Sequence, residues 1–130
     1  PYDAGINVAD HCQVVNCISS LNNGPGIRVT GQRGMVYNNV CHENDTEGIL
    51  CENTTACNIR VEFNRITDND TDGLKMDGPG GLVIRNTCAG NVNNYLLHAN
   101  TNYGPIINVV SVGDISGTTN ADHPYANFEY

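Results

Sequence analysis

A four-residue pattern recurs along this chain at a nearly constant spacing, and it limits the fold more than any other feature. In each copy a Gly precedes two apolar residues that flank a variable one, starting at Gly5, Gly26, Gly48 and Gly73, with a degenerate copy from Asn94. Successive copies start 21, 22, 25 and 21 residues apart. A period of this length is typical of solenoids, in which each repeat packs only on its neighbours.

Two further columns follow the first within each period. One is an Asn with a small or branched residue two positions later: Asn16 with Ile18, Asn39 with Cys41, Asn64 with Ile66, and Asn86 with Cys88. The other is a second Asn: Asn22, Asn44, Asn69 and Asn91. A stacked Asn both donates and accepts hydrogen bonds and tolerates a left-handed turn, so the columns predict ladders that account for most of the 20 Asn residues.

Each copy of the pattern alternates apolar and exposed positions, as a β-strand does. Gly, Asn, Asp and Pro interrupt the chain too often for helices of ordinary length. The sequence therefore predicts one all-β domain over residues 1–130: a parallel β-helix of about five turns, or rungs, of 21 to 25 residues with three short strands each. The repeats span about residues 5–93, and residues 94–130 form a closing segment.

The segments "GIRV…VYNNVCHEN", "GILC…VEFNRITDN" and "GLKM…LVIRNTCAGN" resemble the repeats of right-handed parallel β-helix proteins of the pectate-lyase-like superfamily. The tail from Gly104 is similar to the closing segment of secreted bacterial β-helix proteins without assigned activity. The resemblance implies the fold. It leaves the function open, because this superfamily includes lyases, hydrolases, tailspikes, adhesins and structural repeats.

Composition excludes several partners and suggests a location. Fourteen acidic residues against six basic ones give a net charge of −8, which disfavours nucleic acid as a partner. No apolar run approaches the roughly 18 residues of a membrane helix, so membrane insertion is not expected. Six Cys in so short a chain suggest an oxidising compartment, and we expect a secreted protein in the extracellular space or at a cell surface.

An enzymatic function rests on the resemblance. Polyuronate lyases of the family bind acidic glycans on the exposed face of the first strand stack and use a Lys or Arg as the base, which makes Arg28 and Lys75 the weak catalytic candidates. Leu50 separates them, two strand spacings or about 9.6 Å apart, which is a poor cleft for a polysaccharide. The preferred interpretation is two solvated charges.

Two acidic turns are candidate metal sites. Asp68, Asp70 and Asp72 alternate before a Gly as in a calcium loop, but the twelfth position is Pro79 instead of the Glu that completes an EF-hand. A looser calcium site shared with the preceding turn remains an alternative to plain solvated turns, and its further ligands are Glu43, Asp45 and Glu47. No other cofactor is indicated.

Modification and disulfide sites are also open at this stage. Asn44, Asn53 and Asn69 each start an acceptor triplet for N-glycosylation, which composition alone also generates. Cys41 and Cys88 share a column but lie about 9.6 Å apart, beyond the roughly 7 Å limit for a disulfide. The candidate local disulfides are Cys12 with Cys17 and Cys51 with Cys57.

The ends of the chain suggest assembly. The first rung begins within five residues of Pro1, so either a longer protein has been cut or another chain covers that strand edge. Near the other end, Tyr125, Phe128 and Tyr130 form either a lid or a docking surface. We expect a non-enzymatic structural or assembly module that self-associates head to tail into oligomers or filaments. A domain that binds or cleaves acidic polysaccharide is the alternative.

Overall fold

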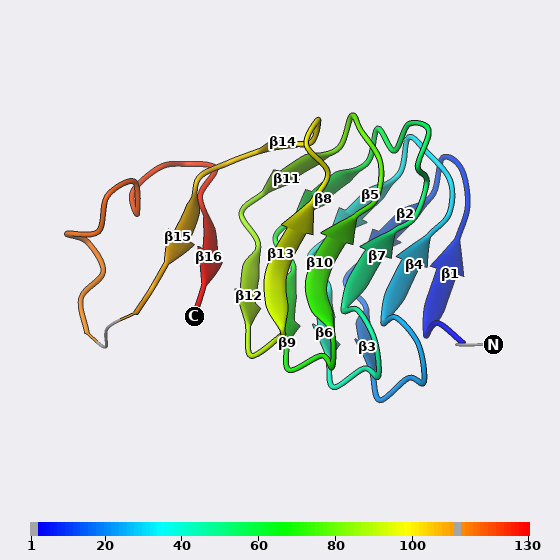
Figure 1. Ribbon diagram of the computed structural model, residues 1–130, viewed down its shortest axis with the longest axis horizontal. Coiled ribbons are helices and arrows are strands. Elements are labelled where there is room, and N and C mark those ends of the chain that lie inside the picture. Colours follow the sequence, from blue (N-terminus) through cyan, green and yellow to red (C-terminus); the bar gives the residue numbers. More distant parts are fainter. Residues whose placement is uncertain (1–2, 111–112) are drawn as a thin grey trace.

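The computed structural model describes residues 3–110 and 113–130, and it is a solenoid of short parallel strands. Three sheets run along its length, and each rung adds one strand to each sheet (Figure 1). The predicted all-β parallel solenoid with three strands per rung is confirmed. The third sheet has six strands where the other two have five, so the stack is slightly longer than the five rungs predicted. Within the described ranges, no helix is long and apolar enough to cross a membrane.

The strand order shows how regularly the chain winds. The first sheet is β1 (Ile6–Val8), β4 (Ile27–Val29), β7 (Ile49–Cys51), β10 (Asp72–Met76) and β13 (Asn93–Leu97). The second is β2 (Gln13–Val15), β5 (Met35–Tyr37), β8 (Arg60–Glu62), β11 (Leu82–Ile84) and β14 (Asn102–Tyr103). The third is β3 (Ile18–Ser20), β6 (Val40–His42), β9 (Arg65–Thr67), β12 (Thr87–Ala89), β16 (Asn127–Glu129) and β15 (Ile106–Asn108).

The core is a set of stacked columns of aliphatic and thiol side chains. Ile27, Ile49 and Leu74 are fully buried and pair in register, and Tyr95 continues their column. The degenerate fifth copy of the pattern is therefore a true rung. Because each residue of a three-residue strand faces either the core or the solvent, a core this narrow needs only one or two apolar residues per strand.

Two asparagine ladders hold the corners between strands. In one, the Asn44 side-chain amide donates to the Asn69 carbonyl oxygen at 2.8 Å, and Asn69 donates to Asn91 at 2.9 Å. Asn22 begins this ladder by donating to Asn44 at 2.7 Å. The ladder is the second Asn column that the sequence predicts.

The other ladder corrects the prediction by one residue in the first rung. Asn39 donates to Asn64 at 3.0 Å, and Asn64 donates to Asn86 at 3.0 Å. Cys17, and not Asn16, precedes Asn39 in this column, because its backbone N–H donates to the Asn39 side chain at 2.9 Å. Asn16 instead stacks with Asn38, and both have positive φ. Asn38 and Asn39 are adjacent in the second rung, and Asn16 belongs to the column of Asn38 instead of the predicted column of Asn39.

The same shift moves Ile18 out of the core. Ser19 pairs with Cys41, which pairs with Ile66, so Ser19 occupies the inward column that was predicted for Ile18. The Ile18 side chain is 73% exposed on the first rung. An apolar residue is therefore left on the surface at this end of the solenoid.

Candidate functional site

The two cations predicted as catalytic candidates are both neutralised by carboxylates. Arg28 and Lys75 lie on the outer face of the first sheet in one column with Leu50 between them, as the pattern predicts. The Arg28 Nε donates to Glu52 at 2.6 Å. The Lys75 ammonium lies 3.5 Å from the Glu47 carboxylate and 3.7 Å from that of Asp77. Both cations on this face are therefore engaged in ion pairs with neighbouring carboxylates.

The acidic turns do not form a metal site in the described residues, where no three His, Cys, Asp or Glu side chains come close enough together to hold a metal ion. Asp68 and Asp70 are exposed on either side of the buried ladder residue Asn69. Asp72 is buried, and its carboxylate accepts a hydrogen bond from Asn93 at 2.8 Å. The alternation that looked like a calcium loop is the alternation of a ladder turn.

The preceding turn repeats this arrangement. Glu43 and Asp45 are exposed on either side of buried Asn44, and Glu47 pairs with Lys75. Of the six predicted ligands, Asp72 and Glu47 already have partners and the other four are exposed, so calcium binding at these turns stays a prediction.

The glycosylation triplets differ sharply in access. Asn44 and Asn69 are 1% and 2% exposed, and their amide nitrogens donate within the ladder. Asn53 lies in the turn after β7, where its side-chain oxygen accepts hydrogen bonds from the backbone N–H groups of Thr55 and Ala56. Attachment of a glycan to Asn44 or Asn69 would break the ladder, so only Asn53 fits a modified folded chain.

All six cysteines are free thiols, and five of them pack in or against the core. Cys12 and Cys17 lie at opposite ends of β2, and the extended strand, at about 3.3 Å per residue, holds them beyond disulfide range. Cys51 and Cys57 are both buried, and the Cys57 thiol donates to the Asn53 carbonyl at 3.0 Å. Neither predicted disulfide is formed.

Burial also affects the reactivity of the core thiols. It raises the pKa of Cys41 to about 12 and that of Cys88 to about 12. A thiol that stays protonated at neutral pH is a weak nucleophile. These cysteines therefore serve the core, as their shared column with Ile66 indicates.

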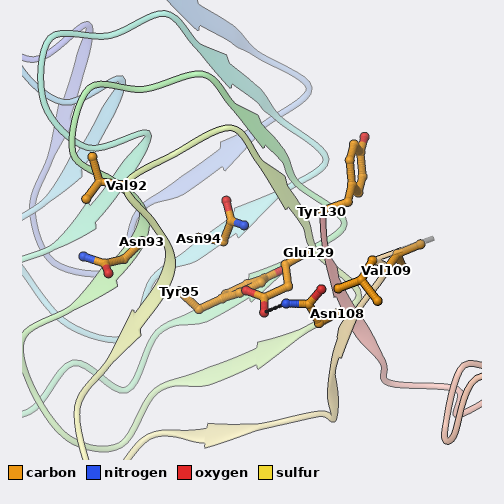
Figure 2. Close-up of a pocket in the computed structure, with 9 residues that line it drawn as sticks. Val92, Asn93, Asn94, Tyr95, Asn108, Val109, Glu129 and Tyr130 are labelled. Atoms are coloured by element: carbon orange, nitrogen blue, oxygen red, sulfur yellow. Dashed lines mark hydrogen bonds between the residues drawn. The ribbon is translucent and has the colours of Figure 1, made fainter. Parts of the chain in front are cut away.

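A cavity of about 480 Å³ lies at the C-terminal end of the solenoid, against β13, the last strand of the first sheet (Figure 2). Its wall comes from β13, from the segment around β15, and from the end of the chain. The lining residues are Val92, Asn93, Asn94, Tyr95, Asn108, Val109, Val110, Glu129 and Tyr130.

Polar groups in this cavity are mostly already paired. The Asn108 amide donates to the Glu129 carboxylate at 3.0 Å, which is the dashed contact in Figure 2. The Tyr95 hydroxyl lies 2.9 Å from the Asn86 carbonyl and 3.0 Å from the Phe128 carbonyl, and it donates its single proton between them. Burial raises the pKa of Tyr95, so the hydroxyl stays protonated. Among the described lining residues, the hydrogen-bonded polar groups of Tyr95, Asn108 and Glu129 lie beside the apolar side chains of Val92, Val109 and Val110.

A second cluster, on the side of the solenoid, has no counterpart in the sequence predictions. The Glu62 carboxylate is almost fully buried and accepts from Arg60 Nε and from an Arg85 Nη, both at 2.6 Å. The Arg85 guanidinium also lies over the rings of Phe63 and Tyr125, 5.2 and 5.0 Å from their centroids. The hydrogen bond from Arg60, followed by that from Arg85, lowers the pKa of Glu62 although burial acts in the opposite direction. Arg60 and Arg85 both donate to Glu62. Because Arg85 also lies over Tyr125, the cluster joins the C-terminal segment to the rungs.

The three aromatic residues near the C-terminus have different roles. Phe128 is partly buried in β16, whereas Tyr125 and Tyr130 are 48% and 60% exposed. Tyr125 packs on Arg85, and Tyr130 lines the end cavity. Phe128 and Tyr130 line one apolar hollow together with Val109, whereas Tyr125 lies apart, on Arg85.

Comparison with known proteins decides the family. The family model of the right-handed β-helix region matches residues 2–120 of the chain. The chain belongs to the right-handed β-helix family. No curated protein and no solved structure matches it. The match agrees with the parallel register of all three sheets and says nothing about an activity.

The open strand edges of this right-handed β-helix lie at its two ends. Within the described residues, β1, β2 and β3 have a strand neighbour on one side only, and so do β13, β14 and β15. Such edges present unpaired backbone N–H and C=O groups to another strand. The side faces of this β-helix carry paired charges, and its C-terminal end carries the cavity.

Proposed function

We propose that the chain is a non-enzymatic structural or assembly module that self-associates end to end through the edges of its first and last rungs. The observation that carries the proposal is the distribution of exposed apolar side chains. Of nine large ones among the described residues, two lie on the first rung and five at the C-terminal end: Ile18 and Leu21, and Val92, Leu96, Tyr103, Val110 and Tyr130. Exposed apolar residues gathered beside open strand edges are typical of interaction surfaces.

The two ends are compatible with each other in strand direction. Every strand pairing in the solenoid is parallel, so β1 of one copy has the right polarity to add to β13 of the next. The cavity lies beside β13, at the position where that strand would pair. The half-buried core residues Ile6 and Val8 would then lie against Tyr95 and Leu97, completing columns that now end at solvent. Such a contact is heterologous and does not close, so it builds a chain of copies.

Charge opposes this association at low ionic strength. Each copy carries a net charge of −8, and the resulting repulsion is screened within about 8 to 10 Å at physiological salt. We therefore expect stacking to strengthen as salt is raised. The contribution of the apolar ends also strengthens under those conditions when the salt is a sulfate or phosphate.

The test is sedimentation velocity over a range of concentrations, with an edge variant and a matched control. Leu96→Lys places a charge on the exposed face of β13, as natural edge strands do to prevent pairing. Thr54→Lys adds the same charge in an exposed turn in the middle of the solenoid. We expect the wild type and Thr54→Lys to form larger species as concentration rises, whereas Leu96→Lys stays monomeric.

A wild-type chain that sediments as a monomer at every concentration and salt would contradict the proposal. Equal association of the two Lys variants would contradict the placement of the contact at β13. An extracellular location, which the composition suggests, is part of the proposal; fractionation of the native source tests it.

A further inference from the structure

The last strand of the third sheet in sequence is not the last in space. β16 lies between β12 and β15, although β15 precedes it in the chain (Figure 1). The chain therefore leaves the solenoid after β15 and returns to fill a position that it had skipped. Every other rung of the described solenoid is wound in sequence order.

β16 is held by contacts that complete the ladder of Asn39, Asn64 and Asn86. Asn127 is fully buried, and its side-chain oxygen accepts from the Asn86 backbone N–H at 3.0 Å. Its amide donates to the carbonyls of Val83 and Gly104, both at 3.1 Å. The backbone N–H groups of Phe128 and Tyr130 donate to the carbonyls of Asn86 and Cys88. The position between β12 and β15 therefore binds one short strand with Asn at its first residue, and we call this position the seat of β16.

The segment that leads into β16 is fixed by a second set of contacts. The Arg85 Nε donates to the Pro124 carbonyl at 2.7 Å, and its guanidinium lies over Tyr125. Gly104 passes so close to Tyr125 that any Cβ on it would overlap the Tyr125 carbonyl oxygen. These contacts join the last residues of the connection, Pro124 and Tyr125, to the rungs directly before β16 begins.

That connection is long, and most of its described residues before Pro124 are exposed. It covers residues 109–126, and its described parts contain no helix or strand. Nearly all of residues 113–125 are exposed, and the loop projects beyond the stacked sheets in Figure 1. No contact of β16 with its seat depends on which copy of the chain supplies the strand.

We propose that β16 is an exchangeable strand: two copies of the chain form a reciprocal dimer in which each β16 fills the seat between β12 and β15 of the other. Exchange of an identical element is a low-cost route to a dimer because the same contacts form in both states. The equilibrium between monomer and exchanged dimer depends on the connection, because it gives β16 an effective concentration in the millimolar range at the seat of its own chain (binding in cis). This dimer is closed and symmetric, so it is independent of the end-to-end stacking proposed above.

The experiment shortens the connection. Parallel strands are normally joined by a dozen or more residues, and deletion of residues 113–122 leaves eight between β15 and β16. The deletion variant is expected to be a dimer at about 1 μM. The full chain is expected to be a monomer at that concentration, because it lies far below the millimolar effective concentration of its own β16. Hydrogen exchange should show the Phe128 and Tyr130 amides equally protected in both proteins.

Three results would overturn the proposal: a deletion variant that is monomeric with protected amides, one that is monomeric with unprotected amides, or a dimer with unprotected amides. The full chain gives a second test that does not depend on the deletion. Refolding at about 1 mM, near the cis effective concentration, should trap a dimer that persists after dilution to about 1 μM, and its absence would contradict exchange.

Two variants separate exchange from stacking. In the Leu96→Lys background the exchanged dimer should survive, because β13 contacts β16 through the Tyr95 hydroxyl, whereas the Leu96 side chain is exposed on the outer face of the sheet. Gly104→Ala in the deletion variant should abolish the dimer, because the added Cβ displaces the segment at Tyr125 from any copy. A dimer lost with Leu96→Lys and kept with Gly104→Ala would assign the association to stacking instead.

Discussion

Truncation of one buried ladder residue should destabilise the whole solenoid, and Asn64→Ala is the clearest case. Asn64 lies in the middle rung, 2% exposed. Its side-chain oxygen accepts from the Asn39 backbone N–H at 2.9 Å, and its amide donates to the Val36 carbonyl at 2.9 Å. Replacement by Ala leaves the Asn39 N–H and the Val36 carbonyl without this hydrogen bond, and both residues are buried.

The magnitude follows from those two groups. A buried polar group left without a partner costs about 1–3 kcal/mol, so the two together predict a loss of about 2–6 kcal/mol in the free energy of unfolding. Domains of this kind are stable by about 5–15 kcal/mol, so the change is a large fraction of the total. Denaturant titration monitored by circular dichroism measures it.

The matched control is Asn38→Gly, one residue from the ladder. Asn38 is exposed, makes one side-chain hydrogen bond to Asn16, and has a positive φ that Gly adopts freely. We expect a loss of about 1 kcal/mol or less. If Asn64→Ala costs no more than Asn38→Gly, the ladder does not stabilise the fold as argued.

Three further predictions concern single positions. Gly48→Ala should destabilise the fold, because its Cβ would lie 2.7 Å from the Asn69 amide nitrogen and 2.9 Å from the Gly73 carbonyl oxygen; an unchanged melting temperature would refute this close approach. The lowered pKa of Glu62 means that its stabilising effect is complete above its ordinary pKa of about 4.3 and is lost as the pH falls through the folded value. The difference in unfolding free energy between wild type and Glu62→Gln should therefore shrink as the pH falls below about 4.3, and a constant difference would count against the cluster. Calcium or a chelator should leave the melting temperature unchanged, whereas a calcium-dependent rise would restore the acidic turns as a metal site.

The sequence predicted the columns that repeat and failed where the repeat ends. The register of the first sheet follows from the Gly pattern because each rung places the same residue types at the same offsets. The first rung was misaligned by one residue because Asn38 and Asn39 are adjacent and only the hydrogen bonds to Asn16 and Cys17 distinguish them.

The contact that places the C-terminal segment in the ladder does not follow the spacing of one repeat. Asn127 lies 41 residues after its ladder partner Asn86, about twice the repeat, so no spacing indicated that the tail supplies a rung. Glu62 and Arg85 occupy neighbouring rungs 23 residues apart, so the repeat itself places this carboxylate beside a cation and indicates the pair.

The alternate carboxylates of the acidic turns also follow from the asparagine ladder. Alternate carboxylates suggest a shared ligand in an isolated loop, but in a ladder turn every second residue points into the solvent and the residue between them into the stack. Asn69 inside, with Asp68 and Asp70 outside, shows this directly.

Negative-stain microscopy of the wild-type chain at high concentration and physiological salt tests the end-to-end proposal most directly. The proposal predicts rods of constant width whose length grows with concentration, each copy adding about five strand spacings of 4.8 Å, or about 24 Å, along the axis. Uniform single particles at every concentration, or lateral aggregates without a common axis, would contradict it.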